Sequence, residues 1–448
     1  MFEKILVANR GEIALRVIRA AKEMDIRTVA VYSTCDVNAL HVRFADEAVC
    51  IGPAQAAQSY LSIPNVISAA EITGVDAIHP GYGFLAENIA FAKAVRGHGM
   101  TFIGPAPEHL GTFGDKLSAK AAAKAAGVPL IPGSDGAIDD VEQAAEVAKE
   151  IGYPIMLKAA FGGGGKGMRV VEDEAGLRKV FELTSAEALA AFGNGAVFME
   201  RFLPAPRHIE VQVAGDAFGN ALHFAERDCS MQRRHQKLIE EAPSFGLPDK
   251  LRDDIRAAAA QLVAHTGYQT VGTVEFLVQE DEFFFLEVNP RIQVEHPVTE
   301  MVTGVDLVQL QIRLAAGEKM PMTQDEVTVT GHSIEVRVNA EDPWTFLPSP
   351  GTITGYHAPG GPGIRIDSAV HEQAMVQPYY DSLVAKLIAT AHDRETAIKK
   401  MLVAMDQFVV EGIKTTIPLQ RTLLAGTAFR ESTFHTRYVD TWLKERNT

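Results

Sequence analysis

Apolar and polar positions follow two different periods over the first hundred residues. Short apolar runs at KILVAN and RTVAVYS are typical of buried strands. Between them, Ile13, Val17, Ala20 or Ala21, and Met24 recur at helical spacing. The alternation returns with VISAAEITG as a helix and with VDAIHP and TFIGP as strands. We therefore predict an open parallel sheet with helices on both faces over residues 1–103.

The pattern changes after residue 103. A helical linker is predicted over 104–129, where GDKLSAKAAAKAAG precedes the turn-rich VPLIPGSDG. Residues 130–203 form a smaller unit with strands YPIMLKAA, MRVV and AVFMERFL and a helix from about 174 to 191. Its small size and its place between larger parts predict a mobile lid.

Residues 204–448 are predicted to form a mainly antiparallel C-terminal domain. Strands IEVQVAG and ALHFAE, then TVEFLVQ and EFFFLEVN, are joined by short turns. A later helix is predicted over RETAIKKMLVAMDQFVVEG. The fold class is therefore α/β at the start of the chain and α+β later.

Composition narrows the possible partners and the compartment. The 448 residues carry 42 basic and 57 acidic side chains, and this net charge of -15 disfavours general binding to nucleic acid or anionic membranes. Cys35, Cys50 and Cys229 lack the spacing of a disulfide framework or a structural zinc site. No run approaches the roughly 18 apolar residues of a membrane span, and the N-terminus lacks a signal-peptide core. We expect a cytoplasmic enzyme.

A glycine-rich loop in KAAFGGGGKGMRVV, residues 158–171, is the first candidate for chemistry. Gly162, Gly164 and Gly167 satisfy G-x-G-x-x-G, but a strand follows them where a dinucleotide-binding turn needs a helix. Lys166 precedes glycine instead of Ser or Thr, which excludes a Walker A loop. A glycine hairpin between strands is typical of a lid over nucleotide phosphates, with an exposed flexible turn as the alternative.

A second glycine-containing turn occurs in HPGYGFLAEN, where Tyr82 lies between Gly81 and Gly83. It follows a predicted parallel strand, and strand ends are where such sheets bind ligands. A loop that only reverses the chain is an equal alternative.

Two acidic residues interrupt the apolar strands TVEFLVQ and EFFFLEVN. If residues 280–282 form a three-residue loop, Glu275 and Glu287 are cross-strand partners with Cβ atoms about 5 Å apart. With Asn289 on the same face, this oxygen-only set predicts Mg²⁺ or Mn²⁺ bridging substrate phosphates. A solvated strand face is the alternative.

The adjoining segment NPRIQVEHP places Arg291, Gln293 and Glu295 on one side if it is extended. Arginine beside glutamate would bind a small oxyanion and supply a base for its proton. The alternative is a surface ion pair, which contributes under about 1 kcal/mol.

A basic cluster in ERDCSMQRRHQK is predicted to bind an anion such as phosphate, bicarbonate or carboxylate. It comprises Arg227, Arg233, Arg234, His235 and Lys237. Cys229 inside it is either a reactive thiol or, as we favour, a packed side chain. Arg337 follows Glu335 at strand spacing and is a further inward-facing candidate.

Taken from the residues alone, these features indicate an ATP-using ligase or kinase with Lys116 and Lys158 directed at phosphates. Protein-kinase motifs of the H-R-D and D-F-G type are missing, which favours a ligase.

The order of the motifs then resembles one family along essentially the full chain. ILVANRGEIALRVIRA, HPGYGFLAEN, FIGP, GDKLSAK, GGGGKGM, AERDCSMQRRHQK, EEAP, EVNPRIQVEHPVTE, NAEDP and FLPSPG resemble the biotin carboxylase component of biotin-dependent carboxylases, in the ATP-grasp superfamily. The resemblance implies an ATP-grasp fold. It also implies that MgATP and bicarbonate give ADP and carboxyphosphate, whose CO₂ passes to N1′ of biotin on a carrier protein.

The resemblance also implies residue roles. The nucleotide would be bound by Lys116, Lys158, Gly164, Gly165, Glu200, Arg201, Phe202, Leu203, His208, Gln232, His235, Glu275 and Glu287. The metal would be bound by Glu275, Glu287 and Asn289. Bicarbonate and biotin would be bound by Lys237, Arg291, Gln293, Val294, Glu295, Arg337 and Tyr82. Of these, Lys237, Arg291, Glu295 and Arg337 would be catalytic, with Glu295 as the base for bicarbonate and Arg337 stabilising the biotin enolate.

Three departures from the family pattern bear on the final acyl acceptor. Phe161 followed by four glycines is a form associated more with the pyruvate carboxylase branch; Pro290 and Arg201 stand where a small residue and Lys are common. We expect a free-standing, homodimeric carboxylase component that meets a biotin carboxyl carrier protein and a carboxyltransferase. Acetyl-CoA carboxylase of fatty-acid synthesis is the favoured system. Pyruvate or propionyl-CoA carboxylase, another ATP-grasp carboxylate ligase and a non-catalytic binder are the alternatives.

Overall fold

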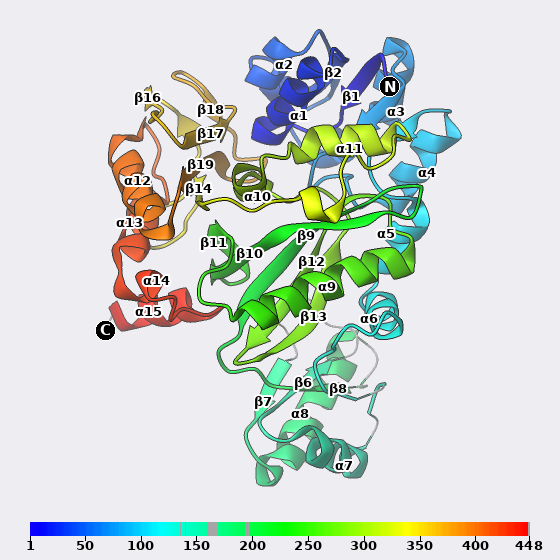
Figure 1. The fold of residues 1–448 in the computed structure, drawn as a ribbon, viewed down its shortest axis with the longest axis vertical. Coiled ribbons are helices and arrows are strands. Elements are labelled where there is room, and N and C mark those ends of the chain that lie inside the picture. The colour runs from blue at the N-terminus through cyan, green and yellow to red at the C-terminus, as the bar shows by residue number, and fades with distance from the viewer. Residues whose placement is uncertain (135, 139, 160–167, 193–194, 196, 447–448) are drawn as a thin grey trace. The chain divides into compact units, whose positions relative to one another are not determined.

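The computed structural model describes residues 1–134, 136–138, 140–159, 168–192, 195 and 197–446. The chain divides into two compact units, one formed by Met1–Val128 with Arg207–Thr448 and the other by Pro129–Pro206 (Figure 1). Gly164, Gly165 and Phe161, which the sequence places in a phosphate lid, lie outside the described residues.

The first sheet confirms the predicted parallel arrangement. It contains β1 (Lys4–Val7), β2 (Arg27–Ser33), β3 (Glu47–Gly52), β4 (Ala77–His79) and β5 (Thr101–Phe102), all parallel in the order β3-β2-β1-β4-β5. Along β1, Ile5 packs with α1 (Gly11–Glu23), whereas Leu6 packs with α3 (Ile63–Thr73) and α4 (Ile89–Gly97). Because successive strand residues point to opposite faces, the helices cover both sides of the sheet.

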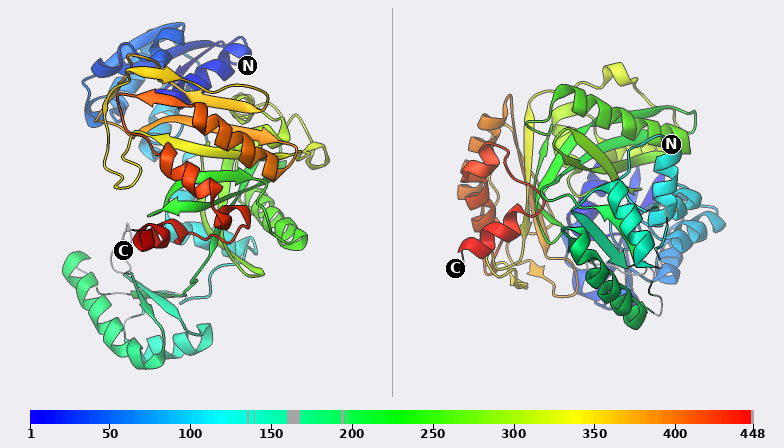
Figure 2. Two further views of the ribbon diagram at one scale, coloured as in Figure 1. Left: turned by 90° about the vertical axis from the view of Figure 1, so that its left-hand side faces the viewer. Right: turned by 90° about the horizontal axis from the view of Figure 1, so that it is seen from below.

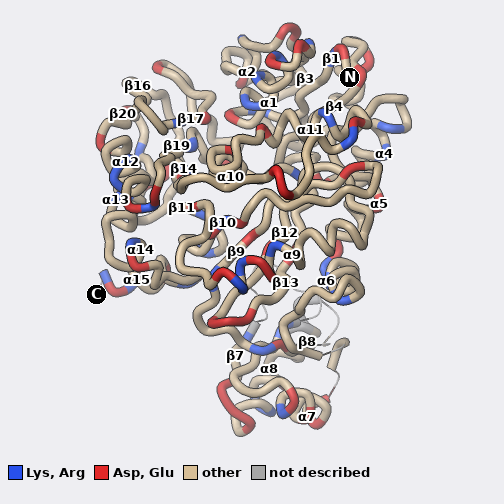
Figure 3. Tube along the Cα trace, viewed as in Figure 1, with Lys and Arg blue, Asp and Glu red and all other residues tan. Residues whose placement is uncertain are grey.

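The large sheet of the same unit is antiparallel and has the order β13-β12-β9-β10-β11-β14-β19-β17. Its strands are β9 (Arg207–Gly215), β10 (Ala221–Arg233), β11 (Gln236–Ala242), β12 (Thr270–Gln279), β13 (Glu282–Asn289), β14 (His332–Asn339), β17 (Ile364–Ser368) and β19 (Leu383–Ala391). Acidic and basic residues are interspersed along these strands (Figure 3). The sheet therefore carries side chains of both charge signs.

Helices bury the apolar positions of this sheet. α12 (Arg394–Gln407) and α13 (Ile417–Ala425) pack on β14 and β19 through a core that includes Met401 and Leu424 (Figure 2, left). α9 (Asp249–Thr266) packs on β9 and β10, and α10 (His296–Thr303) packs on β10, β11, β14 and β19. The placement of α10 matters most, because the sequence NPRIQVEHP leads directly into it.

The remaining elements of this unit complete its fold. They are α2 (Leu40–Phe44), α5 (Pro107–Gly114), α6 (Lys116–Ala125), α11 (Leu307–Ala315), α14 (Thr427–Arg430), α15 (Tyr438–Arg446), β15 (Gly351–Thr352), β16 (Gly355–His357), β18 (Met375–Val376), β20 (Val409–Glu411) and three 3-10 turns. The helix predicted through FVVEG is too long. α12 ends at Gln407, Phe408 enters the core, and β20 pairs with β16.

The second unit is built on a three-stranded antiparallel sheet in the order β7-β6-β8. It contains β6 (Ile155–Ala159), β7 (Met168–Val171), β8 (Val197–Arg201), α7 (Val141–Ile151) and α8 (Glu174–Phe192). Ile155, Leu157, Val171 and Leu177 are buried in its own core. β6 and β7 pair on either side of the glycine run, so the run is flanked by strands as the sequence predicts.

Among the described residues, no helix has the length and apolar character needed to cross a membrane.

Candidate active site

A lysine of the large sheet lies among three carboxylates, two on the neighbouring strands β9 and β12 and one just before α10. Lys237 Nζ on β11 lies 2.6 Å from Glu210 Oε2, 3.0 Å from Glu275 Oε1 and 2.6 Å from Glu295 Oε1. Only 11% of its side chain is exposed. Burial opposes its charge, but the surrounding carboxylates Glu210, Glu275 and Glu295 raise the pKa of Lys237 well above its usual value. The ammonium therefore stays charged.

Strand register places these groups together. Glu210 on β9 is the direct partner of Glu275 on β12 and of Arg227 on β10. Cross-strand partners share a face, so the three side chains project to one side of the sheet. Arg227 is fully buried and donates to Glu210 Oε1 at 2.5 Å and to Gln212 Oε1 at 2.7 Å. The arginine compensates charge within the protein and is not exposed to an anion.

Glu295 lies at the centre of the arrangement and immediately precedes α10. Its carboxylate is fully buried and accepts from Lys237 Nζ at 2.6 Å and from Arg337 Nη2 at 2.8 Å. Although burial favours the neutral acid, Lys237 and Arg337 hold the pKa of Glu295 well below its usual range. The group is therefore ionised and able to accept a proton.

The expectation that Arg291 and Glu295 form a pair on an extended segment is wrong. Residues 291–295 are not a strand, because the chain turns there into α10. Arg291 instead pairs with Glu87 and donates to Asn289 Oδ1 at 3.0 Å and Gln293 Oε1 at 2.9 Å. The cations that contact Glu295 come from β11 and β14.

The carboxylate hairpin has the predicted pairing with a different loop. Glu275 and Glu287 are direct cross-strand partners. The loop contains only Glu280 and Asp281, and an irregularity after Glu275 leaves Leu286 as an extra residue on β13. A shorter loop and a bulge thus give the same pairing as the predicted three-residue loop.

The oxygen-bearing side chains of this hairpin are suited to bind a hard divalent cation. Asn289 Nδ2 donates to Glu275 Oε1 at 2.9 Å, and His208 Nε2 lies 2.9 Å from Glu275 Oε2. Glu287 has no cation of its own within ion-pair distance among the described residues, although it faces Glu275. Burial and the Glu275 charge raise the pKa of Glu287. Two facing carboxylates with an unbalanced charge are chemically suited to Mg²⁺ or Mn²⁺.

Two glutamine side chains hold Glu275 and its neighbour His208 in place. Gln293 Nε2 donates to Glu275 Oε1 at 3.3 Å, and Gln232 Nε2 lies 3.3 Å from His208 Nδ1. Burial disfavours charge on His208, but Glu275 raises the pKa of its imidazole above the usual value. These contacts restrict the rotation of the Glu275 carboxylate.

The predicted basic cluster is divided by strand alternation and by a turn. Arg227 and Lys237 point into the carboxylate cluster, whereas Arg233 stacks over Phe346 at 3.8 Å. Arg234 and His235 form the β10–β11 turn with positive φ of 47° and 67°, and both are exposed. The five residues are therefore not one continuous anion-binding patch.

The predicted nucleotide residues are distributed over both units. Lys116 begins α6 in the first unit, next to the capping residue Asp115. In the second unit, Lys158 on β6 pairs with Glu200 on β8. Arg201 ends β8, and Phe202 donates its backbone amide to the Pro154 carbonyl at 2.9 Å before Leu203, which is buried.

The turn that carries Tyr82 is rigidly held. Gly81 has φ of 63°, and a Cβ there would lie 2.9 Å from Asn9 Nδ2. Asn9 Nδ2 donates to the Pro80 and Tyr82 carbonyls at 2.7 Å each. The Tyr82 hydroxyl bonds to Glu12 in α1, so its orientation is fixed within the protein.

Lys386 is a buried charge that sequence reasoning missed. Its Nζ donates to the Val294 carbonyl at 2.7 Å and lies 3.3 Å from Glu12 Oε2. The available signal was a lysine in the otherwise apolar strand LVAKLIATA. Glu210, Glu240 and Glu87 were missed as well, and Glu335 was noted only as the neighbour of Arg337. Glu210 interrupts the predicted strand IEVQVAG.

Cys229 is packed, as favoured over a reactive thiol. Its side chain is fully buried and its Sγ lies 3.9 Å from Glu295 Oε1. Burial, with Glu210 nearby, raises the pKa of the thiol well above its usual value. All three cysteines are free thiols.

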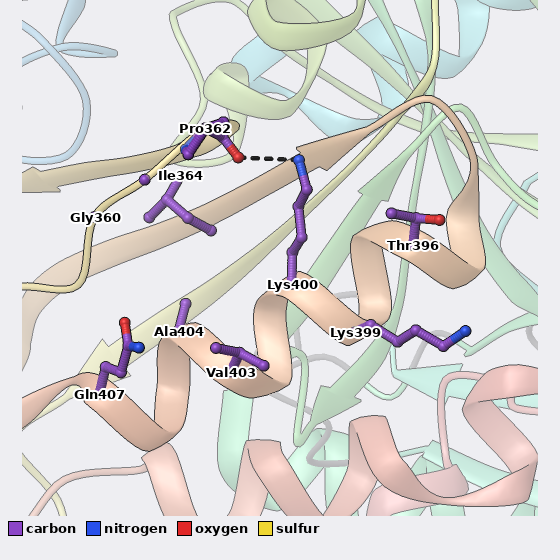
Figure 4. A pocket seen from close by; sticks show the side chains of 10 residues that line it. Gly360, Pro362, Ile364, Thr396, Lys399, Lys400, Val403, Ala404 and Gln407 are labelled. Atoms are coloured by element: carbon purple, nitrogen blue, oxygen red, sulfur yellow. Dashed lines mark hydrogen bonds between the residues drawn. The ribbon is translucent and has the colours of Figure 1, made fainter.

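A groove of about 410 Å³ lies elsewhere in the first unit, along α12. Its lining includes Pro362, Ile364, Lys399, Lys400 and Val403 (Figure 4). Lys400 Nζ is bonded to the Pro362 carbonyl at 2.9 Å and to the Thr390 carbonyl at 3.1 Å. The described residues of this lining include no carboxylate, so the groove offers no acid-base pair.

Comparisons with known proteins agree along almost the whole chain. Residues 1–110 match the family "Biotin carboxylase, N-terminal domain", 115–323 match "Carbamoyl-phosphate synthase L chain, ATP binding domain" and 335–441 match "Biotin carboxylase C-terminal domain". A biotin carboxylase of Pseudomonas aeruginosa is 54% identical over 98% of both chains.

Two further relatives belong to other carboxylases. A pyruvate carboxylase component of Methanothermobacter thermautotrophicus is 50% identical over 98% of this chain and 90% of its own. The bicarbonate-bound biotin carboxylase domain of a thermophilic 2-oxoglutarate carboxylase is 47% identical over 98% of both chains, with a TM-score of 0.94.

Proposed function

This chain belongs to the biotin carboxylase family, and we propose that it carboxylates biotin on a carrier protein with ATP and bicarbonate. The observation that carries the proposal is Glu295, a buried and ionised carboxylate clamped by Lys237 and Arg337. An ionised carboxylate can take up a proton, which the neutral acid cannot. A biotin carboxylase needs such a base to deprotonate bicarbonate.

The residues suit capture of a small oxyanion next to that base. Lys237 and Arg337 supply the positive charge, and Arg291 presents a planar guanidinium held by Asn289 and Gln293. Glu295 accepts the bicarbonate proton at a carboxylate oxygen, and the resulting dianion attacks the terminal phosphorus of ATP to give carboxyphosphate and ADP. Arg337 is then assigned to the biotin ureido oxygen, with Tyr82 fixed nearby in the same unit.

Glu275, Glu287 and Asn289 are proposed to hold Mg²⁺ or Mn²⁺, for which the facing carboxylates are suited. When bound, the ion neutralises phosphate charge on the nucleotide. Lys116, His208, Gln232 and His235 in the first unit, and Lys158 with Glu200–Leu203 in the second, are assigned to ATP. Gly164 and Gly165 keep their proposed place over the phosphates.

Bicarbonate-dependent ADP release, with and without free biotin, tests the function. We expect ATP hydrolysis to need bicarbonate and to be stimulated by biotin. Glu295→Gln should abolish turnover while ATP binding persists, because the amide cannot accept the proton. Glu326→Gln is the control, since Glu326 is exposed and Gln also suits its capping box. Hydrolysis that needs no bicarbonate would favour another ATP-grasp ligase, and equal loss of ATP affinity in Glu295→Gln would contradict the assignment of the base.

We propose acetyl-CoA carboxylase as the parent system, with a separate biotin carboxyl carrier protein and carboxyltransferase and a homodimeric carboxylase component in the cytoplasm. The 54% identity to the Pseudomonas aeruginosa biotin carboxylase supports the biotin carboxylation step that this system shares with pyruvate and propionyl-CoA carboxylase. The pyruvate carboxylase component of Methanothermobacter thermautotrophicus is almost as similar, and it keeps pyruvate as the second candidate; propionyl-CoA is the third. Affinity purification of the chain from its host and assay of the associated carboxyltransferase with the three acceptors would separate them.

A further inference from the structure

Two buried glutamates face each other behind Arg337. Glu240 on β11 and Glu335 on β14 are direct cross-strand partners, and neither is exposed. Arg337, two residues after Glu335 on the same face, donates from Nε to Glu240 Oε1 at 2.5 Å. Its Nη2 donates to Glu295 Oε2 at 2.8 Å. One guanidinium thus connects this glutamate pair to the carboxylate assigned as the base.

The four oxygens of these two carboxyl groups outnumber the hydrogen-bond donors around them. Glu240 Oε2 and both oxygens of Glu335 are buried without a hydrogen-bond donor among the described residues. Buried polar atoms in native proteins are almost always bonded, and an unpartnered carboxylate is costly. A proton on one carboxyl, donated to the other, would satisfy two of these three oxygens. Paired carboxylates elsewhere reach the same solution, because two buried carboxylates that face each other repel and one of them takes up a proton.

The surrounding charges do not neutralise both glutamates. The titratable and charged groups that face the pair are Arg337 on β14, Lys386 on β19, Lys237 on β11, Cys229 on β10 and Glu295 before α10. Lys386 is already shared by Glu12 and, at 3.9 Å, Asp367 of β17, and Lys237 by three carboxylates. His296 of α10 is buried, and its pKa lies well below the usual value, so it is neutral. Burial raises the pKa of Glu240 to about 7 and that of Glu335 well above its usual range.

We propose that Glu240 and Glu335 share a single proton, and that the pair sets the charge behind Arg337 and thereby the electrostatic environment of Glu295. Glu335 is a positioning residue in this arrangement, because it acts through Glu240 and Arg337. With the proton in place, the pair carries one negative charge, which Arg337 balances while it also binds Glu295. Loss of the proton adds a second negative charge beside the bicarbonate residues. The kinetic consequence rests on the proposed function, whereas the shared proton does not.

Infrared spectroscopy of the resting protein tests the proton without substrate. At neutral pH, the difference between wild type and Glu335→Gln should contain the carbonyl band of a protonated carboxyl group, shifted by ¹³C labelling of glutamate. Glu241→Gln is the matched control. Glu241 is the next residue of β11, is equally buried, and pairs with His332 and Arg394, which hold its pKa low. Its difference spectrum should contain only ionised carboxylate bands. The same result for Glu335→Gln would overturn the proposal.

The Michaelis constant for bicarbonate tests the link to the active site. In wild type it should rise on the order of tenfold as the pair loses its proton with increasing pH, since an added negative charge repels the anion. Glu335→Gln places a permanent neutral hydrogen-bond donor beside Glu240, so the rise of the Michaelis constant with pH should disappear. An unchanged pH dependence of this Michaelis constant would contradict the coupling.

Urea denaturation tests whether Glu240 needs a hydrogen-bond donor. Glu335→Leu, neutral but without a donor, should unfold at a lower urea concentration than Glu335→Gln; equal midpoints would show that Glu240 needs no donor. If wild type shows no bicarbonate-dependent turnover, the proposed function fails, and the infrared result still decides the shared proton.

Discussion

At the candidate site, a few buried cations each neutralise more than one carboxylate. Lys237 contacts three carboxylates, and Arg227, Arg337 and Lys386 supply the remaining positive charge. A buried ion pair adds little net stability against an apolar pair, but removal of one partner leaves the other uncompensated. Each of these cations is therefore expected to be more costly to remove than any surface cation.

Lys237→Gln should lower the free energy of unfolding by about 3–5 kcal/mol at neutral pH, because Glu210, Glu275 and Glu295 lose their common cation. Urea denaturation followed by circular dichroism measures the change. Lys250→Gln is the control, since Lys250 is 87% exposed and pairs only with Asp254 on its own helix, so its loss should change the value by less than about 0.5 kcal/mol. Equal effects of the two substitutions would contradict the buried network.

Asp367 gives a prediction for acid conditions. Burial opposes its charge, but Arg365 and Lys386 lower its pKa to about 2 from the usual 3.8. A lowered carboxyl pKa stabilises the folded protein above the unfolded value, and that contribution is lost as pH falls toward the folded value. Asp367→Asn should therefore cost at least about 2 kcal/mol at neutral pH, and its deficit should narrow between about pH 4 and pH 2.

Urea titrations at stepped pH measure this deficit. Asp406→Asn is the control, because Asp406 is 53% exposed and pairs with Arg421 at the surface. A deficit of Asp367→Asn that stays constant through the acid range would show that the carboxylate is not held ionised by its partners.

At the scale of single elements, the β12–β13 hairpin shows which features the sequence predicts and which it does not. The apolar strands predict the hairpin, and the two interrupting glutamates predict the pairing of Glu275 with Glu287, which is confirmed. The loop length is wrong because nothing in FFFLEV distinguishes a regular strand from one with a bulge at Leu286. Periodicity fixes which face a residue occupies and leaves local irregularities open.

The long-range contacts are harder to derive. Lys237, Glu295 and Arg337 come from β11, the start of α10 and β14, and their contacts depend on a strand order that the sequence does not state. Local pattern led us to pair Arg291 with Glu295, since the two are near in sequence. The fold instead brings Arg337 from 42 residues away. The family resemblance selected these residues without supplying the contacts between them.

Glu287→Gln tests the hairpin as a metal-binding element. The facing carboxylates Glu275 and Glu287 repel each other without a cation, so the amide should raise the melting temperature of the metal-free protein. It should also weaken Mn²⁺ binding by at least about tenfold, which corresponds to about 1.4 kcal/mol. Calorimetry and Mn²⁺ titration measure the two effects. Glu280→Gln, in the turn of the same hairpin, is the control and should change neither; a stable Glu287→Gln variant with unchanged Mn²⁺ affinity would remove Glu287 from the metal site.

At the scale of the whole chain, the candidate site residues belong to two units, each with its own hydrophobic core. The Lys237 cluster, the carboxylate hairpin and the Glu240–Glu335 pair all belong to Met1–Val128 with Arg207–Thr448. Pro129–Pro206 contains Lys158, Glu200–Leu203 and the glycine run, which are proposed to bind ATP. Its buried residues, such as Ile155, Leu157 and Val197, pack with one another in a core of their own.

Separate cores predict that the first unit folds without the second. Replacement of residues 130–205 by a flexible Gly-Ser linker of about 20 residues, whose average span is about 25 Å, should leave one cooperative unfolding transition. Because Glu275 and Glu287 remain, Mn²⁺ binding should persist, whereas bicarbonate-dependent ATP hydrolysis should be lost with Lys158 and the glycine run. The full chain carrying Glu287→Gln is the control with the opposite pattern, since it keeps the second unit and loses the metal. A deletion variant that is unfolded would mean that the first unit depends on the second for stability, and retained ATP hydrolysis would remove Lys158 and its neighbours from the nucleotide site.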